Sequence, residues 1–178
     1  MIHLARHGQT AYNAEGRFQG HLPVPLDDTG REQARRLADA VADVEVRTLV
    51  CSPLARARET ADIVAERIGL APEEDTRFAE TDTGDWTGRS FAEVEAEDPD
   101  GFRRYEISDP TFRYPGGESF AEQSDRVQAG LADLRARTAD LPALVVCHRG
   151  CIRLALAVAT GDHTNGGREI GNATLVSL

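Results

Sequence analysis

Short apolar runs alternate along this chain with longer stretches in which apolar residues recur at helical spacing. Four runs predict β-strands, at residues 1–5, 48–51, 144–147 and 173–178. The run at 144–147 is continuously apolar, as expected for a central strand covered on both faces. The alternation predicts an α/β fold, a three-layer α/β/α sandwich with a mostly parallel central sheet.

Local capping patterns predict where the helices begin and end. Three segments have the spacing of a capping box, namely Thr29 to Glu32, Ser90 to Glu93 and Ser119 to Glu122. Ser52 followed by Pro53 predicts an N-cap with proline at the first helical position. Another helix is expected over 152–160, and Gly69 and Gly161 are expected to end helices. Residues 8–27 and 71–89 are expected to be irregular, apart from a short strand at 77–79, and Pro99 is expected to interrupt the helix that follows Ser90.

The length and the even composition indicate one domain over residues 1–178. No internal repeat, linker or low-complexity segment divides the chain. Because the sequence ends inside an expected strand, a continuation of the natural chain past Leu178 is left open.

The charge balance excludes several classes of partner. The net charge is −10, which disfavours binding to nucleic acid or to an anionic membrane surface. No apolar stretch approaches the roughly 20 residues that span a bilayer, and no signal-peptide pattern is present. Three cysteines without a Cys-x-x-Cys pair fit a reducing compartment, so we expect a cytoplasmic protein.

All 20 basic residues are arginine, because the chain contains no lysine. This absence excludes a P-loop lysine, a Schiff-base lysine and the lysine–glutamate pair of kinases. It also means that an arginine becomes informative only through its position.

Three of the predicted strands end in residues suited to binding a phosphate. The first delivers Arg6 and His7, the second Ser52 and then Arg56, and the third His148 followed by Arg149 and Arg153. The carboxyl ends of parallel strands meet at one edge of a sheet, so these groups are expected to surround one small anion.

The segment Arg6-His7-Gly8 has the chemistry for attack on phosphorus. A neutral imidazole is a nucleophile, and a guanidinium group matches the oxygens of a phosphate. Gly8 would let the backbone approach a ligand closely.

These motifs resemble the histidine phosphatase superfamily, the phosphoglycerate mutase-like group. The resemblance is carried, in the family's order, by Arg6-His7-Gly8-Gln9-Thr10-x-x-Asn13, Phe18-Gln19-Gly20, Ser52-Pro53-Leu54-Ala55-Arg56, Glu80, Gly84-Asp85-Trp86, Pro115-Gly116-Gly117-Glu118-Ser119 and His148-x-x-x-x-Arg153. It spans nearly the whole chain and implies a phosphoglycerate mutase-like fold.

The resemblance also implies a role for each matched residue. His7 would be the nucleophile that forms a phosphohistidine, and Glu80 the general acid for the leaving alkoxide, with Asp82 as the alternative. The residues expected to bind the phosphoryl group or the leaving group are Arg6, Asn13, Gln19, Gly20, Arg56, His148 and Arg149. No metal and no cofactor is expected, because the arginines replace the usual cation.

Two positions depart from the family pattern. Arg149 stands where the family usually has glycine, and could donate to a phosphate, pair with an acidic neighbour or narrow the pocket. Thr87 stands where many members have glutamate, which weakly disfavours a mutase. Separately, Cys147-His148-x-x-Cys151 raises the alternative of a metal site, although zinc usually needs a second ligand pair.

The sequence therefore predicts a cofactor-independent phosphomonoesterase that acts on a small-molecule phosphate ester. The alternatives are phosphoryl transfer of the phosphoglycerate mutase type and a non-catalytic protein that binds a phosphorylated ligand. Substrate choice is expected to lie in residues 99–114 and in the loop after Gly161. The sequence predicts neither the natural ester nor the oligomeric state.

Overall fold

A five-stranded sheet forms the centre of the molecule in the computed structural model, which describes residues 1–139, 141–162 and 169–178. The strand order is β3-β2-β4-β1-β5. Four strands are parallel, β1 (Ile2–Arg6), β2 (Thr48–Cys51), β3 (Glu73–Glu74) and β4 (Ala143–Cys147). The last strand, β5 (Leu175–Ser177), is antiparallel to β1 at the edge of the sheet. The expected mostly parallel sheet is confirmed.

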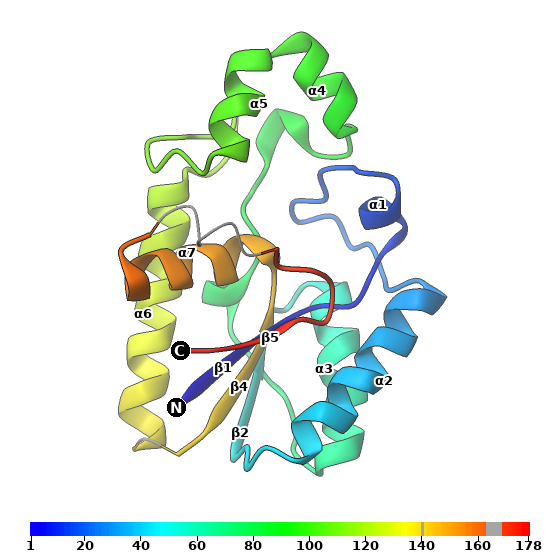
Figure 1. Cartoon of the computed structure of the whole chain (residues 1–178), viewed down its shortest axis with the longest axis vertical. Helices are drawn as coiled ribbons and strands as arrows, with labels where there is room; N and C mark the ends of the chain where they lie inside the picture. The colour runs from blue at the N-terminus through cyan, green and yellow to red at the C-terminus, as the bar shows by residue number, and fades with distance from the viewer. Residues whose placement is uncertain (140, 163–168) are drawn as a thin grey trace.

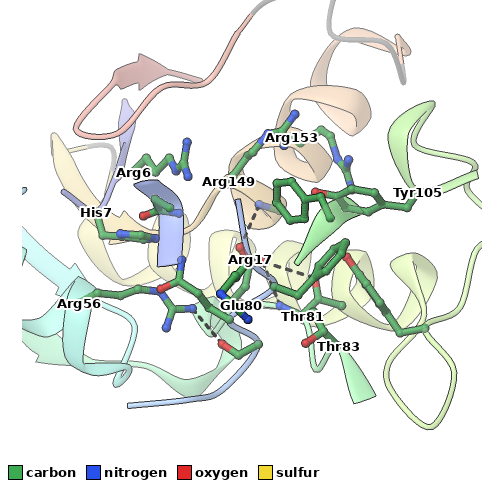
Figure 2. Close-up of a pocket in the computed structure, with 17 residues that line it drawn as sticks. Arg6, His7, Arg17, Arg56, Glu80, Thr81, Thr83, Tyr105, Arg149 and Arg153 are labelled. Carbon is green, nitrogen blue, oxygen red and sulfur yellow. Dashed lines mark hydrogen bonds between the residues drawn. The ribbon is translucent and has the colours of Figure 1, made fainter. Parts of the chain in front are cut away.

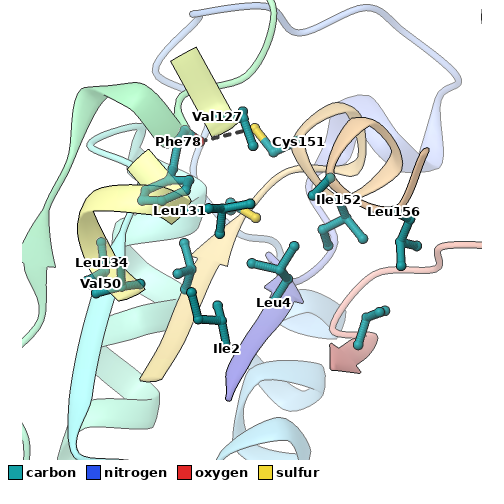
Figure 3. Packing of buried hydrophobic residues seen from close by; sticks show 14 of the residues in the cluster. Ile2, Leu4, Val50, Phe78, Val127, Leu131, Leu134, Cys151, Ile152 and Leu156 are labelled. Carbon is teal, nitrogen blue, oxygen red and sulfur yellow. Dashed lines mark hydrogen bonds between the residues drawn. The ribbon is translucent and has the colours of Figure 1, made fainter. Parts of the chain in front are cut away.

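Two pairs of long helices cover the two faces of this sheet (Figure 1). Helices α2 (Asp28–Ala42) and α3 (Ala55–Ile68) pack together on one face, where Leu37 and Val64 meet Leu49 in the core. Helices α6 (Phe120–Thr138) and α7 (Arg149–Thr160) cover the other, where Leu131 and Ile152 pack against the strands (Figure 3). The arrangement is the expected three-layer sandwich.

Short helices and loops lie beyond the carboxyl end of the sheet. They include α1 (Ala11–Ala14), the 3-10 helices Thr76–Phe78 and Gly84–Trp86, α4 (Phe91–Glu97) and α5 (Pro99–Glu106). A separate cluster of aromatic side chains holds this region together, namely Phe18, Trp86, Phe102, Phe112, Tyr114 and Phe120. Helices α4 and α5 thus cap the end of the molecule at which the strand exits open (Figure 1).

Two predicted helix starts are wrong. Helix α2 begins at Asp28, because the carboxylate of Asp27, and not the hydroxyl of Thr29, accepts the hydrogen bond from Gly30 N at 2.7 Å. Helix α3 begins after Leu54, not after Ser52, since the Ser52 hydroxyl bonds the ring of His148 as well as Leu54 N. The capping boxes at Ser90 and Ser119 are confirmed, as are the helix ends at Gly69 and Gly161.

Other differences lie in the connecting segments. The strand expected at 77–79 is wrong, since a 3-10 helix occupies 76–78 and the strand is two residues long at Glu73–Glu74. The predicted interruption at Pro99 is confirmed, since α4 ends at Glu97; the helix α5 that starts at Pro99 was not predicted, and proline suits its first position after the Asp98 cap. The segment 8–27 contains the short helix α1, and α7 begins at Arg149, before residue 152. The loop directly after Gly161 lies mostly outside the described residues.

No helix in the described ranges is long and apolar enough to cross a bilayer.

Candidate active site

One pocket gathers most of the residues that the motifs single out (Figure 2). It lies between the carboxyl end of the sheet and the cap formed by α4 and α5. Of the predicted site residues, those lining it are Arg6, His7, Asn13, Gln19, Gly20, Arg56, Glu80 and Arg149. His148 is fully buried and lies beside His7, outside the lining.

His7 directly follows β1, and its ring is fixed by a backbone group. Its Nδ1 lies 2.6 Å from the carbonyl oxygen of Gly8. A carbonyl can only accept, so Nδ1 carries the hydrogen and Nε2 keeps its lone pair. Burial, followed by the charges of Arg56 and Arg6, holds the pKa of His7 well below its ordinary value. The ring is therefore a neutral imidazole with an available nitrogen, which is the form that attacks phosphorus.

The turn after His7 packs directly on the start of α2. A Cβ added at Gly8 would collide with the carbonyl oxygen of Gly30, and a Cβ at Gly30 would collide with the backbone of Gln9. The structure therefore explains glycine at position 8 by contact with a helix, and not by the expected approach of a ligand. Gly8 N also donates to Thr60 Oγ1 of α3 at 3.1 Å, so both helices fix the turn.

His148 is held by the end of the neighbouring strand. Its Nε2 lies 2.7 Å from Ser52 Oγ, and its ring centroid lies 5.1 Å from that of His7. Its Nδ1 is buried and has no hydrogen-bond partner among the described residues. Burial lowers the pKa of His148 well below its ordinary value, and the charge of Arg56 lowers it further. A buried ring nitrogen without a partner, beside the ring of His7, could bond a ligand oxygen.

Arg56 is a buried cation and Arg6 a half-buried one, and neither pairs with a carboxylate within 4.0 Å among the described residues. Arg56 is 1% exposed and donates to the carbonyls of Gly20 at 2.9 Å and Leu22 at 3.3 Å. Arg6 donates to the carbonyl of Ile170 at 2.7 Å, and the Nε atoms of both arginines lack a partner among the described residues. Burial lowers the pKa of each to about 10. Uncompensated buried charge of this kind favours the binding of an anion.

Glu80 provides the only carboxylate among the described residues that line the pocket. One of its oxygens accepts hydrogen bonds from Thr81 N at 2.9 Å and Gln123 Nε2 at 3.1 Å, and the other from Gly150 N at 3.5 Å. Burial by itself raises its pKa, but the Thr81 hydrogen bond and the charge of Arg56 outweigh burial, and the net pKa is lowered. Glu80 is thus ionised in the free protein. Asp82, the alternative acid, does not line the pocket and instead accepts from Gly84 N at 3.0 Å.

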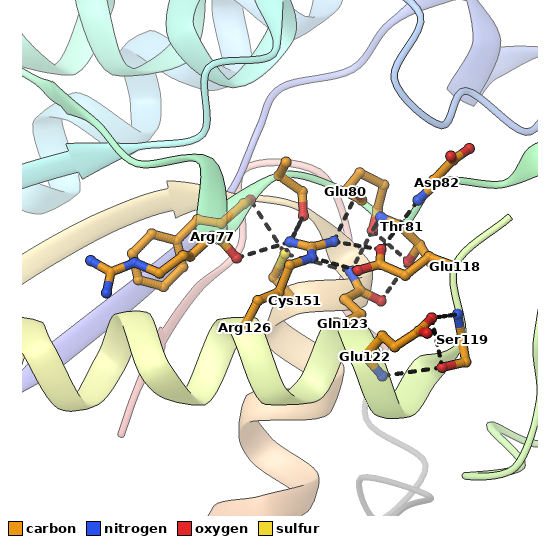
Figure 4. A network of polar contacts seen from close by, with 12 residues as sticks. Arg77, Glu80, Thr81, Asp82, Glu118, Ser119, Glu122, Gln123, Arg126 and Cys151 are labelled. Atoms are coloured by element: carbon orange, nitrogen blue, oxygen red, sulfur yellow. Dashed lines mark hydrogen bonds and ion pairs between the residues drawn. The ribbon is translucent and has the colours of Figure 1, made fainter.

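Arg126 of α6 fixes the backbone on which Glu80 stands (Figure 4). Its guanidinium donates to the carbonyls of Arg77 at 2.9 Å, Ala79 at 2.6 Å and Glu80 at 3.1 Å. The same group forms a bidentate pair with Glu118, at 2.6 and 2.8 Å. Three backbone carbonyls within residues 77–80 are thereby tied to a long helix.

Asn13 and Gln19 face the pocket with their oxygen atoms already engaged. Thr10 Oγ1 donates to Gln19 Oε1 at 2.9 Å, and Asn13 Oδ1 accepts from Asn172 Nδ2 at 3.2 Å. The amide N–H groups are what these two side chains can offer, and such donors suit an anionic ligand.

Sequence reasoning missed about half of the lining. The additional residues are Arg17, Phe18, Thr81, Thr83, Phe91, Tyr105, Tyr114 and Gly150. Arg153, expected near the anion because it follows Arg149 by one helical turn, also lines the pocket. Tyr105 lies on α5, which the interpretation of Pro99 as a break concealed.

The side chains of the Cys147-His148-x-x-Cys151 segment form hydrogen bonds with protein groups and do not converge as metal ligands would. The Cys151 thiol donates to the carbonyls of Phe78 at 3.3 Å and Ala79 at 3.2 Å, and His148 bonds Ser52. Within the described residues, no group of three or more His, Cys, Asp or Glu side chains could hold a metal ion.

Comparisons with known proteins agree with this geometry. The chain is 37% identical to a glucosyl-3-phosphoglycerate phosphatase of Mycolicibacterium vanbaalenii, over 98% of this chain and 82% of the relative. It is 34% identical to a probable phosphoglycerate mutase of Salmonella choleraesuis, over 85% and 72%. A mycobacterial glucosyl-3-phosphoglycerate phosphatase solved in complex with VO3 superposes with a TM-score of 0.88 at 34% identity, over 98% of this chain and 90% of that one. The family model for the histidine phosphatase superfamily (branch 1) matches residues 2–178, and the chain belongs to that family.

Proposed function

We propose that the protein hydrolyses a small phosphate monoester through a covalent phosphohistidine at His7. The observation that carries this proposal is the neutral His7 ring beside Arg6 and Arg56, two arginines whose Nε atoms are buried and which pair with no carboxylate within 4.0 Å among the described residues. A phosphate would supply the missing negative charge and place its phosphorus next to the nucleophile.

In the first step, His7 Nε2 attacks phosphorus and the bond from phosphorus to the ester oxygen breaks. Arg6, Arg56 and His148 stabilise the charge on the phosphoryl oxygens. Glu80 donates a proton to the leaving alkoxide. In the free protein, burial raises the pKa of Glu80, but the Thr81 hydrogen bond and the charge of Arg56 outweigh burial and lower it. The negative charges of a bound phosphate oppose the effect of Arg56, so they raise the pKa of Glu80 again. Glu80 thus becomes the acid when substrate is present.

In the second step, water hydrolyses the phosphohistidine. Glu80, now a carboxylate, accepts a proton from the water as the water oxygen attacks phosphorus. The bond between phosphorus and His7 Nε2 breaks, and inorganic phosphate and a neutral His7 result. Asn13, Gln19 and Gly20 complete the phosphate-binding lining.

A cytoplasmic location is also part of the proposal, and three buried free thiols support it.

The relatives indicate which esters to assay first. The names of the related phosphatases suggest glucosyl-3-phosphoglycerate, and the name of the probable mutase suggests 3-phosphoglycerate. Free phosphate released from 3-phosphoglycerate supports the hydrolase, whereas formation of 2-phosphoglycerate without phosphate release supports the mutase.

The central test uses p-nitrophenyl phosphate with EDTA present. We expect phosphate release by the wild type, an acid-labile phosphoenzyme after quenching, and loss of both in His7→Ala. His3→Gln, a change on the same strand outside the pocket, is the matched control and should retain activity. Absence of turnover by the wild type between pH 5 and 8 contradicts the proposed function, and activity that survives in His7→Ala contradicts the mechanism.

A further inference from the structure

We propose that Arg149 and Arg153 form a second anion-binding subsite beside the phosphate pocket, so that the preferred ester carries another negative charge on its alcohol part. The inference rests on the proposed function and deepens it. The shared chemistry of the ligand is an anionic group, either a carboxylate or a second phosphate.

The ion pairs of the molecule single out these arginines. In the ranges that the structure describes, 14 arginines pair with a carboxylate within 4.0 Å. Five described arginines form no such pair, and four of these line the active-site pocket: Arg6, Arg56, Arg149 and Arg153. The fifth, Arg135, is exposed on α6 and does not line the pocket; Arg149 is exposed as well, but it does line the pocket. In an acidic chain that pairs most of its arginines, the uncompensated cations are concentrated where a ligand binds.

Arg153 has the environment of a built site. The residue is only 8% exposed, and its guanidinium carbon lies 4.5 Å from the ring centroid of Phe120 and 6.0 Å from that of Tyr105. Its Nε has no hydrogen-bond partner among the described residues. Aromatic contacts hold the group in place but leave donors unused, and a buried donor without a partner is costly unless a ligand satisfies it.

Arg149 extends this charge toward the phosphate end of the pocket. It precedes Arg153 by four residues on α7, so both project from the same helix face. Figure 2 shows Arg6, Arg149 and Arg153 along one side of the pocket. The pKa of Arg6, lowered to about 10, owes its shift first to burial and next to the charge of Arg149, which places these two cations near one another.

The charges of the lining exceed what one phosphate needs. Arg6 and Arg56 can accompany the phosphoryl group, and Glu80 is held by Thr81, Gln123 and Gly150. Arg149 and Arg153 then remain without a counter-ion. A second acidic group on the alcohol part of the substrate would neutralise these two cations. An ester with an uncharged alcohol part would leave both cations unpaired.

The test compares two esters that differ in one group. 3-Phosphoglycerate carries a carboxylate where glycerol 3-phosphate carries a hydroxymethyl group. Their binding is measured by calorimetry with His7→Asn, which cannot turn them over. We expect 3-phosphoglycerate to bind about tenfold to a hundredfold more tightly, the effect of charge-assisted hydrogen bonds. In His7→Asn/Arg149→Ala, this ratio should fall to within about threefold of unity, whereas His7→Asn/Arg135→Ala should keep it.

A second pair of ligands distinguishes the two sources of charge. Glucose 1,6-bisphosphate binding more tightly than glucose 1-phosphate, with the preference lost in Arg149→Ala, assigns the subsite to a second phosphate. A preference confined to 3-phosphoglycerate assigns it to a carboxylate. Equal affinities within both pairs, or preferences that Arg149→Ala leaves unchanged, overturn the proposal. Because binding needs no turnover, failure of the p-nitrophenyl phosphate assay would reject the proposed hydrolysis and leave this measurement decisive for the subsite.

Discussion

Arg56 and Arg126 are two guanidinium groups of the same molecule, and only one of them is compensated. Arg126 donates to three backbone carbonyls and forms a bidentate pair with Glu118. Arg56 is more deeply buried, donates to two carbonyls and pairs with no carboxylate. Burial lowers the pKa of Arg126, but the hydrogen bond with Glu118 and nearby acidic groups outweigh burial, so the net pKa is raised; burial lowers the pKa of Arg56 to about 10.

This contrast indicates that Arg126 stabilises the fold, whereas Arg56 is suited to binding an anionic ligand. Glu80 lies between the two, since Arg126 holds its backbone and Arg56 lowers the pKa of its carboxyl group. Each half of the contrast can be tested by removing one arginine and comparing activity with stability.

The largest effect is expected for Arg56→Met. Loss of a cation that faces the transferring phosphoryl group should lower kcat/KM by about 10³-fold or more. The free energy of unfolding should change by less than about 1 kcal/mol, because removing an uncompensated buried charge offsets the loss of two hydrogen bonds. Steady-state kinetics and urea denaturation measure the two quantities. A large loss of stability with modest loss of activity would make Arg56 a structural residue and erase the contrast.

Glu80→Gln should have the next largest effect, and only on some esters. An alkyl leaving group needs a proton, so kcat should fall by about 10²–10³-fold on glycerol 3-phosphate. p-Nitrophenolate is a stable anion, so the loss on p-nitrophenyl phosphate should stay below about tenfold. Asp82→Asn is the control and should show no such pattern. If Asp82→Asn reproduces it, the general acid is Asp82.

Arg126→Met is expected to act on stability first. Removal of the charge leaves Glu118 partly buried and unpaired, which should lower the free energy of unfolding by about 2–3 kcal/mol, as urea denaturation would measure. Activity should fall by about tenfold through the looser Glu80 segment, with kcat affected more than KM. Adding Glu118→Leu should recover part of the stability but not the activity. Unchanged stability in Arg126→Met would contradict the assigned role.

The smallest effect concerns the protonation of His7. Its pKa is lowered by burial, then by Arg56 and Arg6, so the ring should stay neutral when the pH falls from 7 to 5. An ordinary histidine would become mostly protonated over that range. Nitrogen chemical shifts of His7 measure the state directly. In Arg56→Met the midpoint should move upward, and in Arg126→Met it should not. A midpoint above 6.5 in the wild type would refute the proposed ground state.

The sequence was sufficient for four of the five strands and for the class of enzyme. Apolar runs and apolar helix stripes predict the sandwich. A strand that is buried on both faces is continuously apolar, and a helix that packs on a sheet has apolar residues at helical spacing. The family match confirms the expected phosphoric monoester hydrolase. The roles of His7 and Glu80 remain predictions, although the fold brings both side chains to one pocket.

The errors of prediction arose where side chains serve tertiary contacts. Ser52 is a residue type that often caps a helix, but its hydroxyl bonds His148, a residue 96 positions away. Rules based on neighbouring residues cannot predict that partner. Pro99 does interrupt the helix that follows Ser90, but the sequence patterns did not predict that Asp98 caps a new helix, which brings Tyr105 to the pocket. The missed lining residues came from that helix and from loops, whose positions depend on an aromatic cluster that no periodic pattern describes.

The contact between Gly8 and Gly30 has a consequence for redesigning this enzyme. Each position is closed to any side chain by backbone of the other segment, so neither can be varied alone and no single compensating change opens the space. A mutagenesis library that aims at new substrates should therefore keep these two codons fixed. Diversity is better placed at Tyr105 and Arg149, whose side chains border the pocket.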